Sequence, residues 1–133
     1  MKKRLLVMVT GMALIFSMAL AASAAWSSDT VLDVPGWNGN ATSSVSAAKS
    51  RSDSQCTFQT YENQAWGLYG VDGRLLNSDG VARSSWARDM HTGTTLHAAT
   101  TAVSGHYYWA QLSTDLLEPN TISVSFRFSP DNE

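Results

Sequence analysis

Cysteine and charge are both scarce in this chain of 133 residues. Cys56 is the only cysteine, which excludes an intramolecular disulfide and leaves the fold to be held by its buried core. Charged residues make up 15% of the chain and form no run of like sign after residue 4, unlike the basic tracts of nucleic-acid-binding proteins. Phosphate-binding loops and dinucleotide fingerprints are also lacking, so the sequence predicts no cofactor.

A membrane-spanning run is lacking as well. The longest apolar stretch, residues 5–20, is interrupted by small polar residues and is shorter than the ~20 residues that a spanning helix needs. Lys2, Lys3 and Arg4 precede this stretch, and Ala22-Ser23-Ala24 follows it, which is the pattern of a secretory signal peptide. We therefore expect residues 1–24 to be a signal peptide, cleaved after Ala24 or one residue later. Residues 25–133 would form a single secreted, extracellular domain with no stable membrane anchor.

Cleavage would change the charge balance of the protein. It would remove three of the 9 basic residues and none of the 11 acidic residues, which leaves a net charge of −5. An acidic domain is not expected to bind nucleic acid or to be attracted to anionic membranes.

Helical periodicity is absent from residues 25–133, whereas alternation of apolar and polar residues recurs. Ser and Thr supply 16 and 11 of these residues, a composition that suits strands and turns better than helices. The clearest strand is Thr121–Phe128, in which Ile122, Val124, Phe126 and Phe128 point one way and the polar residues point the other. Further strands are predicted at Ala41–Lys49, Gln55–Tyr61, Trp66–Val71, Arg74–Leu76, Val81–Arg88, Thr94–Val103 and His106–Ser113.

Turn signals separate the predicted strands. Asp72-Gly73 and Ser104-Gly105 each indicate a hairpin turn, and Asn77-Ser78-Asp79-Gly80 indicates another turn. Residues 35–40 and 115–120 are expected to be loops, and residues 50–54, after Lys49, a solvated turn. Short strands at such regular spacing predict an all-β fold, a small antiparallel two-sheet β-sandwich.

Cys56 lies on the same predicted strand face as Phe58. A buried, inert thiol is the expected state, because free cysteine is among the most buried residue types. A reactive thiol or an intermolecular bridge is the alternative.

Three histidines, His91, His97 and His106, lie close together in the sequence and near Asp89. His97 and His106 flank the predicted Ser104-Gly105 turn and could approach each other. Their spacing matches no metal-binding signature, and no serine lies in a GxSxG or SxxK motif, so we expect neither a metal site nor a catalytic site.

Aromatic residues are the more informative feature. Trp37 lies in a Pro-Gly/Asn-Gly loop, where burial is not expected, and Tyr107 and Tyr108 lie on opposite faces of one predicted strand. Exposed Trp and Tyr side chains near loops are typical of surfaces that bind sugars, proteins or lipid headgroups. We take Trp37 with Tyr107 or Tyr108 as the candidate binding face.

The layout resembles that of small secreted β proteins of Gram-positive bacteria. The matching pieces are the Thr/Ala-rich segment Thr94–Val103, the Tyr-rich segment His106–Leu112, and Ile122–Asp131, which ends in Ser-Pro-Asp. They resemble an uncharacterised family of short secreted proteins and, more distantly, the lactococcin-type bacteriocins, which are exported by a signal peptide and fold as β-sandwiches. No functional residue is carried over from either group.

These observations favour a non-enzymatic protein that acts outside the cell by binding a cell-envelope component or another secreted protein. The resemblance adds a bacteriocin-like, antibacterial role as one form of this activity. The alternative is a small secreted hydrolase that uses a His/Asp/Ser constellation.

Overall fold

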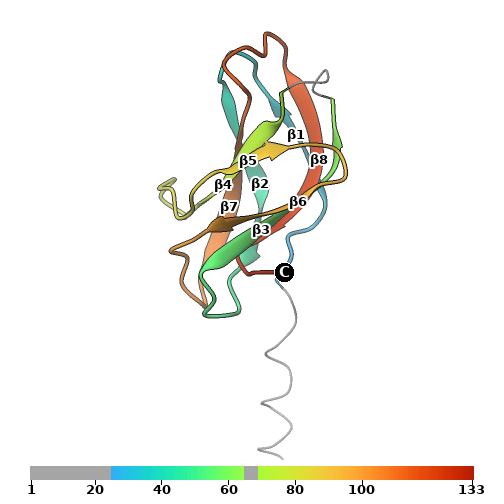
Figure 1. Cartoon of the computed structure of the whole chain (residues 1–133). Coiled ribbons are helices and arrows are strands. Elements are labelled where there is room, and N and C mark those ends of the chain that lie inside the picture. Colours follow the sequence, from blue (N-terminus) through green and yellow to red (C-terminus); the bar gives the residue numbers. More distant parts are fainter. Residues whose placement is uncertain (1–24, 65–68) are drawn as a thin grey trace, which may run out of the picture.

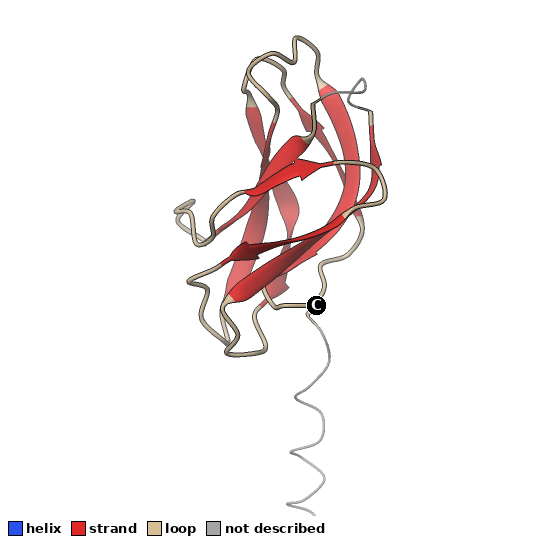
Figure 2. Ribbon diagram, viewed as in Figure 1, coloured by secondary structure: helices blue, strands red, loops and turns tan. Residues whose placement is uncertain are grey.

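The computed structural model describes residues 25–64 and 69–133, which form two antiparallel sheets of four strands each (Figures 1 and 2). These residues contain no α-helix, and so none that could cross a membrane. The strands are β1 (Thr30–Val34), β2 (Asn40–Ala48), β3 (Gln55–Asn63), β4 (Val71–Leu76), β5 (Ala87–Met90), β6 (Thr95–Ala99), β7 (Tyr107–Ser113) and β8 (Ile122–Ser129). The predicted all-β, two-sheet sandwich is confirmed; the predicted signal peptide and Trp66 lie outside the described residues.

The chain passes repeatedly from one sheet to the other. One sheet has the strand order β1-β8-β3-β6 and the other the order β2-β7-β4-β5. Among the described strands, β4 and β5 are the only consecutive pair that are also neighbours in a sheet. The loops at both ends of the sandwich therefore bring together residues that are far apart in the sequence.

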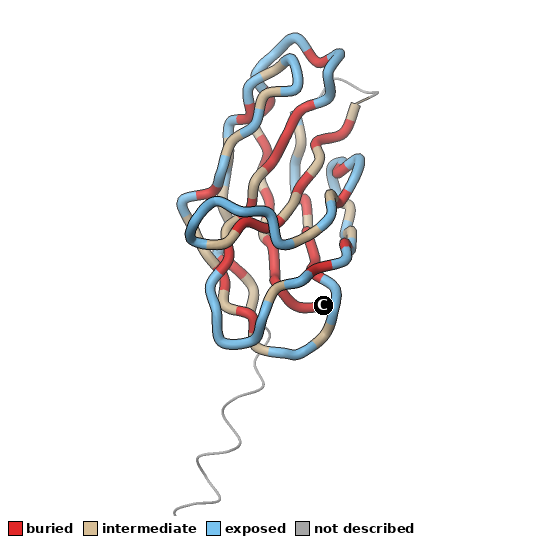
Figure 3. The backbone as a smooth tube through the Cα atoms, turned by 90° about the vertical axis from the view of Figure 1, so that its left-hand side faces the viewer, coloured by how far each residue is buried: buried red, intermediate tan, exposed pale blue. Residues whose placement is uncertain are grey.

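Strand β8 confirms the clearest prediction from the sequence. Ile122, Val124, Phe126 and Phe128 are at most 1% exposed and face the opposite sheet, while the residues between them lie on the outer face. The Phe128 ring packs against those of Phe58 and Phe126, with centroids 6.1 and 6.3 Å away. Figure 3 shows this buried layer running along the strands between the more exposed loops.

Cys56 is buried beside Phe58 in β3, as predicted, and has no disulfide partner. Burial raises the pKa of its thiol to about 11, although hydrogen bonds from neighbouring groups partly oppose this rise. Such a thiol stays protonated at neutral pH and is a weak nucleophile.

The predicted turn at Asp72-Gly73 is wrong, because β4 runs straight through both residues. Gly73 pairs with Leu112 of β7 and faces the core. A Cβ atom on Gly73 would lie 2.7 Å from Met90 Sδ and 3.0 Å from Phe58 Cε1. The glycine is therefore explained by close packing rather than by a turn.

Two further strand predictions need correction. Ser104-Gly105 does form a turn, with a φ of 87° at Gly105, but the turn connects β6 to β7 in the other sheet and does not close a hairpin. The predicted strand Val81–Arg88 is reduced to isolated bridges at Ala82 and Ser84, and β5 begins only at Ala87.

Lys49 is buried, with 2% of its surface exposed, although it was predicted to end a strand next to a solvated turn. Its ammonium group donates to Asp53 Oδ1 at 2.7 Å, to the carbonyl of Pro130 at 2.8 Å and to Asp131 Oδ1 at 3.3 Å. Asp131 also accepts hydrogen bonds from Ser50 and from the Arg51 N–H. This buried ion pair holds residues 130–131 against residues 49–51, which follow β2.

Candidate functional site

The structure does not bring the three candidate aromatic residues together. Trp37 and Tyr107 are 66% and 62% exposed, but Tyr108 faces the core and is 4% exposed. Tyr107 begins β7, whereas the Trp37 loop is bonded to the other end of this strand, where Thr114 N–H donates to the Gly39 carbonyl at 3.0 Å. About 20 Å of strand separates the two exposed rings.

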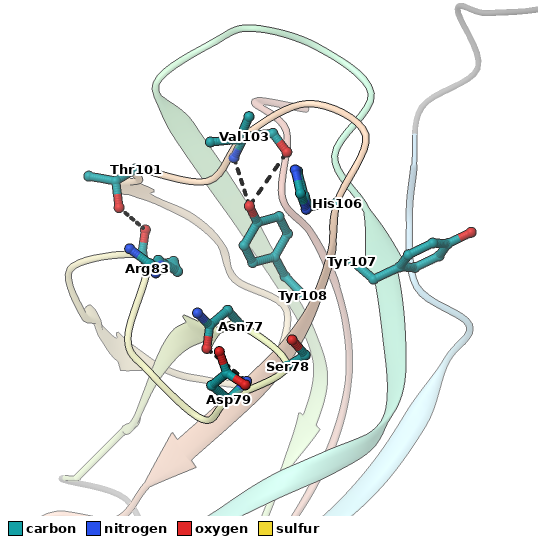
Figure 4. A pocket seen from close by; sticks show the side chains of 9 residues that line it. All are labelled: Asn77, Ser78, Asp79, Arg83, Thr101, Val103, His106, Tyr107 and Tyr108. Atoms are coloured by element: carbon teal, nitrogen blue, oxygen red, sulfur yellow. Dashed lines mark hydrogen bonds between the residues drawn. The ribbon is translucent and has the colours of Figure 1, made fainter.

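A hollow of about 350 Å³ lies at the Tyr107 end of the sandwich, between the β4–β5 loop and the β6–β7 loop (Figure 4). We call it the loop pocket. Its lining residues are predominantly polar, and most are exposed. They are Asn77, Ser78, Asp79, Arg83, Thr101, Val103, His106, Tyr107 and Tyr108.

One wall of the loop pocket is the predicted turn at residues 77–80, which is confirmed. The Asn77 side-chain oxygen accepts from Asp79 N–H at 3.0 Å and from Val81 N–H at 2.9 Å. Gly80 has a φ of 74°, the left-handed conformation that glycine adopts most easily. These bonds fix the turn and leave the side chains of Ser78 and Asp79 exposed at the pocket.

The opposite wall is held by Tyr108. Its hydroxyl accepts from Val103 N–H at 2.7 Å, and Figure 4 shows its ring turned toward that loop while the Tyr107 ring points away. Backbone bonds from Lys49 N–H to the His106 carbonyl, and from Gly105 N–H to the Lys49 carbonyl, tie the same loop to the buried ion pair. Tyr108 therefore holds the β6–β7 loop in place, and its buried ring is not available to contact a ligand.

Arg83 connects the two walls. Its carbonyl accepts from Thr101 N–H at 2.8 Å and from Thr101 Oγ1 at 3.2 Å, and its side chain lines the pocket. The loop pocket thus presents a carboxylate, a guanidinium and an imidazole, while the Tyr107 ring lies at its rim and points away from it (Figure 4). The three polar groups provide hydrogen-bond donors and acceptors for a polar ligand.

The sequence identified Tyr107 and Tyr108 as candidate binding residues, gave His106 no expected role, and did not indicate Asn77, Asp79 or Arg83. Asn77 and Asp79 were recognised only as turn residues. The pocket forms because the β4–β5 loop packs beside the β6–β7 loop of a crossing strand, and no local pattern in either segment indicates that meeting.

The three histidines lie in different parts of the fold. His91 is in the β5–β6 loop, His97 is on β6 with its Nδ1 3.1 Å from Thr57 Oγ1, and His106 lines the loop pocket. Across residues 25–64 and 69–133, no group of three His, Cys, Asp or Glu side chains could hold a metal ion.

The remaining described tryptophans are partly covered. The Arg127 guanidinium lies 4.1 Å from the Trp26 ring centroid, and that of Arg74 lies 4.3 Å from the Trp86 ring centroid. Trp109 is partly buried on the outer face of β7. Trp37 is therefore the most exposed tryptophan that the structure describes.

Comparisons of the chain with protein-family models, with curated proteins and with solved structures gave no match.

Proposed function

We propose that this protein is a secreted, non-enzymatic binding protein that takes a small hydroxylated ligand, such as a sugar unit of a cell-envelope polymer, in the loop pocket. The observation that carries this proposal is that Asp79, Arg83 and His106 line one hollow, with the exposed Tyr107 at its rim.

The chemistry of a sugar matches this set of groups. A pyranose ring presents several hydroxyl groups at its edge and a less polar C–H surface on its face. Asp79 accepts hydrogen bonds and Arg83 donates them. The exposed Tyr107 ring must rotate from its position in Figure 4 to pack against the C–H face of a bound sugar, a change of rotamer that an exposed side chain makes readily. The volume of about 350 Å³ suits one or two sugar units.

Binding is favoured over hydrolysis by the lack of a hydrogen-bonded nucleophile. The loop pocket contains Ser78, Asp79 and His106, the residue types of the alternative hydrolase. Among the residues that the structure describes, no hydrogen bond joins the side chain of His106 to Ser78 or Asp79, whereas an activated serine needs such a bond to its base.

The experiment is a titration of the purified protein with monosaccharides and soluble cell-wall fragments, followed by calorimetry or NMR shifts. Asp79→Asn and Tyr107→Ala should each weaken binding about tenfold or more, because a charge-assisted hydrogen bond or a ring contact is lost. Asp33→Asn is the matched control, since Asp33 is an exposed aspartate on β1, away from the loop pocket.

The outcomes separate the two functions. Equal affinities in all three variants, or no binding of any fragment, would refute the proposed site. Release of a shortened fragment, lost in His106→Ala, would instead establish the hydrolase. A growth-inhibition assay against related bacteria tests whether binding has the antibacterial consequence of a bacteriocin-like protein.

A further inference from the structure

The end of the sandwich opposite the loop pocket carries an exposed apolar tip. It consists of Trp37 in the β1–β2 loop and Leu116 and Leu117 in the β7–β8 loop, whose side chains are 66%, 64% and 60% exposed. We call these three residues the apolar tip. Large apolar side chains gathered at one protruding place on a small domain mark an interaction surface.

The two loops that carry the apolar tip are bonded to each other. Trp37 N–H donates to the Glu118 carbonyl at 2.5 Å, and Asn38 N–H donates to the Asp115 carbonyl at 3.2 Å. A Cβ atom on Gly36 would lie 2.6 Å from the Pro119 carbonyl carbon, so the two backbones are in close contact. The tip is therefore a single unit built from two distant segments.

Trp37 also has an unfavourable backbone conformation. Its φ is 56° and that of Asn38 is 59°, and Gly39 N–H donates to the Gly36 carbonyl at 3.0 Å, which defines a type I′ turn. Glycine, asparagine and aspartate are usual at the central positions of this turn, whereas a bulky residue is an outlier there. A tryptophan that is both strained and exposed is explained by a role in contact with another surface.

Most backbone N–H groups of the tip are bonded within it. Besides the N–H groups of residues 37–39, Leu117 N–H donates to Asp115 Oδ1, Glu118 N–H to the Asp115 carbonyl, and Asn120 N–H to Glu118 Oε1. Pro35 and Pro119 have no N–H to satisfy. Among the described residues, Leu116 N–H has no such partner, and a shallow position in the interfacial region leaves it within reach of headgroups and water. A segment that adds to a partner's sheet needs a row of free N–H groups, which the tip does not offer.

The charges near the apolar tip indicate which kind of membrane surface it can contact. Residues 30–48 and 113–126, which form the tip and the strands leading to it, contain no lysine or arginine, and Asp33 and Asp115 are exposed there. Arg88 of β5 lines a hollow with Asn38 at this end, but its charge is paired with that of Asp72. Glu118 is turned inward and is 4% exposed. An anionic membrane would repel this end of the molecule, whereas a neutral, zwitterionic surface would not.

We propose that the apolar tip inserts into the interfacial region of a zwitterionic lipid bilayer, with Trp37 at headgroup level and Leu116 and Leu117 among the upper acyl chains. Tryptophan prefers this interface because its ring is apolar and its N–H is polar. The described chain starts and ends at the other end of the sandwich, near Phe128 (Figure 1).

The test is flotation of the full-length protein with phosphatidylcholine vesicles whose acyl chains are brominated, because bromine quenches nearby tryptophan fluorescence. Three variants are compared with the parent, namely Trp37→Phe, the double variant Leu116→Ser/Leu117→Ser, and Val81→Ser as an exposed apolar control in the β4–β5 loop at the other end. All of them carry the same residues 1–24, so binding through that apolar segment is common to every sample. Unchanged thermal unfolding establishes that each variant is folded.

We expect lipid-dependent quenching in the parent and in Val81→Ser, loss of the quenched component in Trp37→Phe, and at least tenfold weaker flotation of the double leucine variant. Addition of phosphatidylglycerol should weaken the tip-dependent part. Equal flotation and quenching in all four proteins would overturn the proposal, and so would a parent that does not bind phosphatidylcholine. Failure of the proposed sugar site is a separate result, because that site lies at the opposite end of the molecule and is tested by the sugar titration of Asp79→Asn and Tyr107→Ala.

Discussion

Arg74 and Arg127 have the same surroundings on opposite faces of the sandwich. The Nε of each arginine donates to the side-chain oxygen of a glutamine on the neighbouring strand, Arg74 to Gln111 at 2.8 Å and Arg127 to Gln59 at 2.7 Å. Each guanidinium also lies over a tryptophan that precedes an edge strand, at 4.3 Å for Trp86 and 4.1 Å for Trp26. Each arginine therefore connects the start of an edge strand to two inner strands.

Replacing these arginines with lysine should destabilise the protein, although the charge is kept. Lysine cannot stack a planar group on tryptophan while donating from an Nε position. We expect Arg127→Lys and Arg74→Lys each to lower the free energy of unfolding by about 1 kcal/mol, given the usual size of one such hydrogen bond and one partly exposed cation–π contact. Urea titration measures this, and a Trp26→Leu background should remove most of the effect of Arg127→Lys.

Strand β8 allows a direct comparison of its two faces. Phe126 is fully buried, whereas Ser125 lies on the outer face. Phe126→Ala should lower the free energy of unfolding by about 3–5 kcal/mol, because it leaves a cavity in the core. Ser125→Ala should change it by no more than about 0.5 kcal/mol. Equal shifts of the two urea midpoints would contradict the register of β8.

The buried thiol of Cys56 should be both inert and stabilising. Its pKa of about 11 and its burial predict slow reaction with a thiol reagent at neutral pH, at a rate limited by opening of the fold. Cys56→Ser should cost about 1–3 kcal/mol, because a more polar hydroxyl replaces the thiol in the core. Rapid labelling of the folded protein, or a disulfide-linked dimer that a reductant converts to monomer, would show that the thiol is accessible.

Acid should weaken the bond between the C-terminal residues and β2. Burial alone would raise the pKa of Asp131, but hydrogen bonds from Ser50, Arg51 and Lys49 outweigh it and lower the pKa below its usual 3.8. Because the folded pKa is lower than the unfolded one, this stabilisation is complete above the unfolded pKa and is lost as the pH falls through the folded pKa. We therefore expect the parent to lose stability steeply below about pH 4.

Asp131→Asn tests this assignment. At neutral pH it should be destabilised by about 3 kcal/mol, at the lower end of the range for breaking a buried pair, because Lys49 keeps Asp53 as a partner. Its stability should depend less on pH between 2 and 5 than that of the parent. Asp53→Asn, whose side chain is 26% exposed, should have the smaller effect at neutral pH. A parent and an Asp131→Asn variant with parallel pH profiles would exclude this role.

Alternation of residue types was sufficient to predict the strands that have one face in water. β8 and the Cys56–Phe58 face of β3 follow directly from a period of two. Asp72-Gly73 was misread because the packing of Met90 and Phe58, which requires the glycine, is a tertiary contact. Lys49 was misread for a similar reason, since its partner Asp131 is 82 residues away. Candidate binding residues were found where an aromatic side chain is exposed and missed where loops from different sheets meet.

The position of β8 between β1 and β3 has a consequence for the order of folding. β1 has no hydrogen-bonding neighbour until residues 122–126 are available, and β3 has only β6. A nascent chain of about one hundred residues can therefore pair only two strands of each sheet, β3 with β6 and β4 with β5, and its hydrophobic interior is still open. The first sheet can be completed only when β1 and β3 pair with β8, and β1 and β8 are separated by almost the whole domain in sequence. Contacts between such distant segments form slowly, so we expect folding to be slow and to require β8. Any truncation that removes β8 should accordingly prevent the remaining strands from folding.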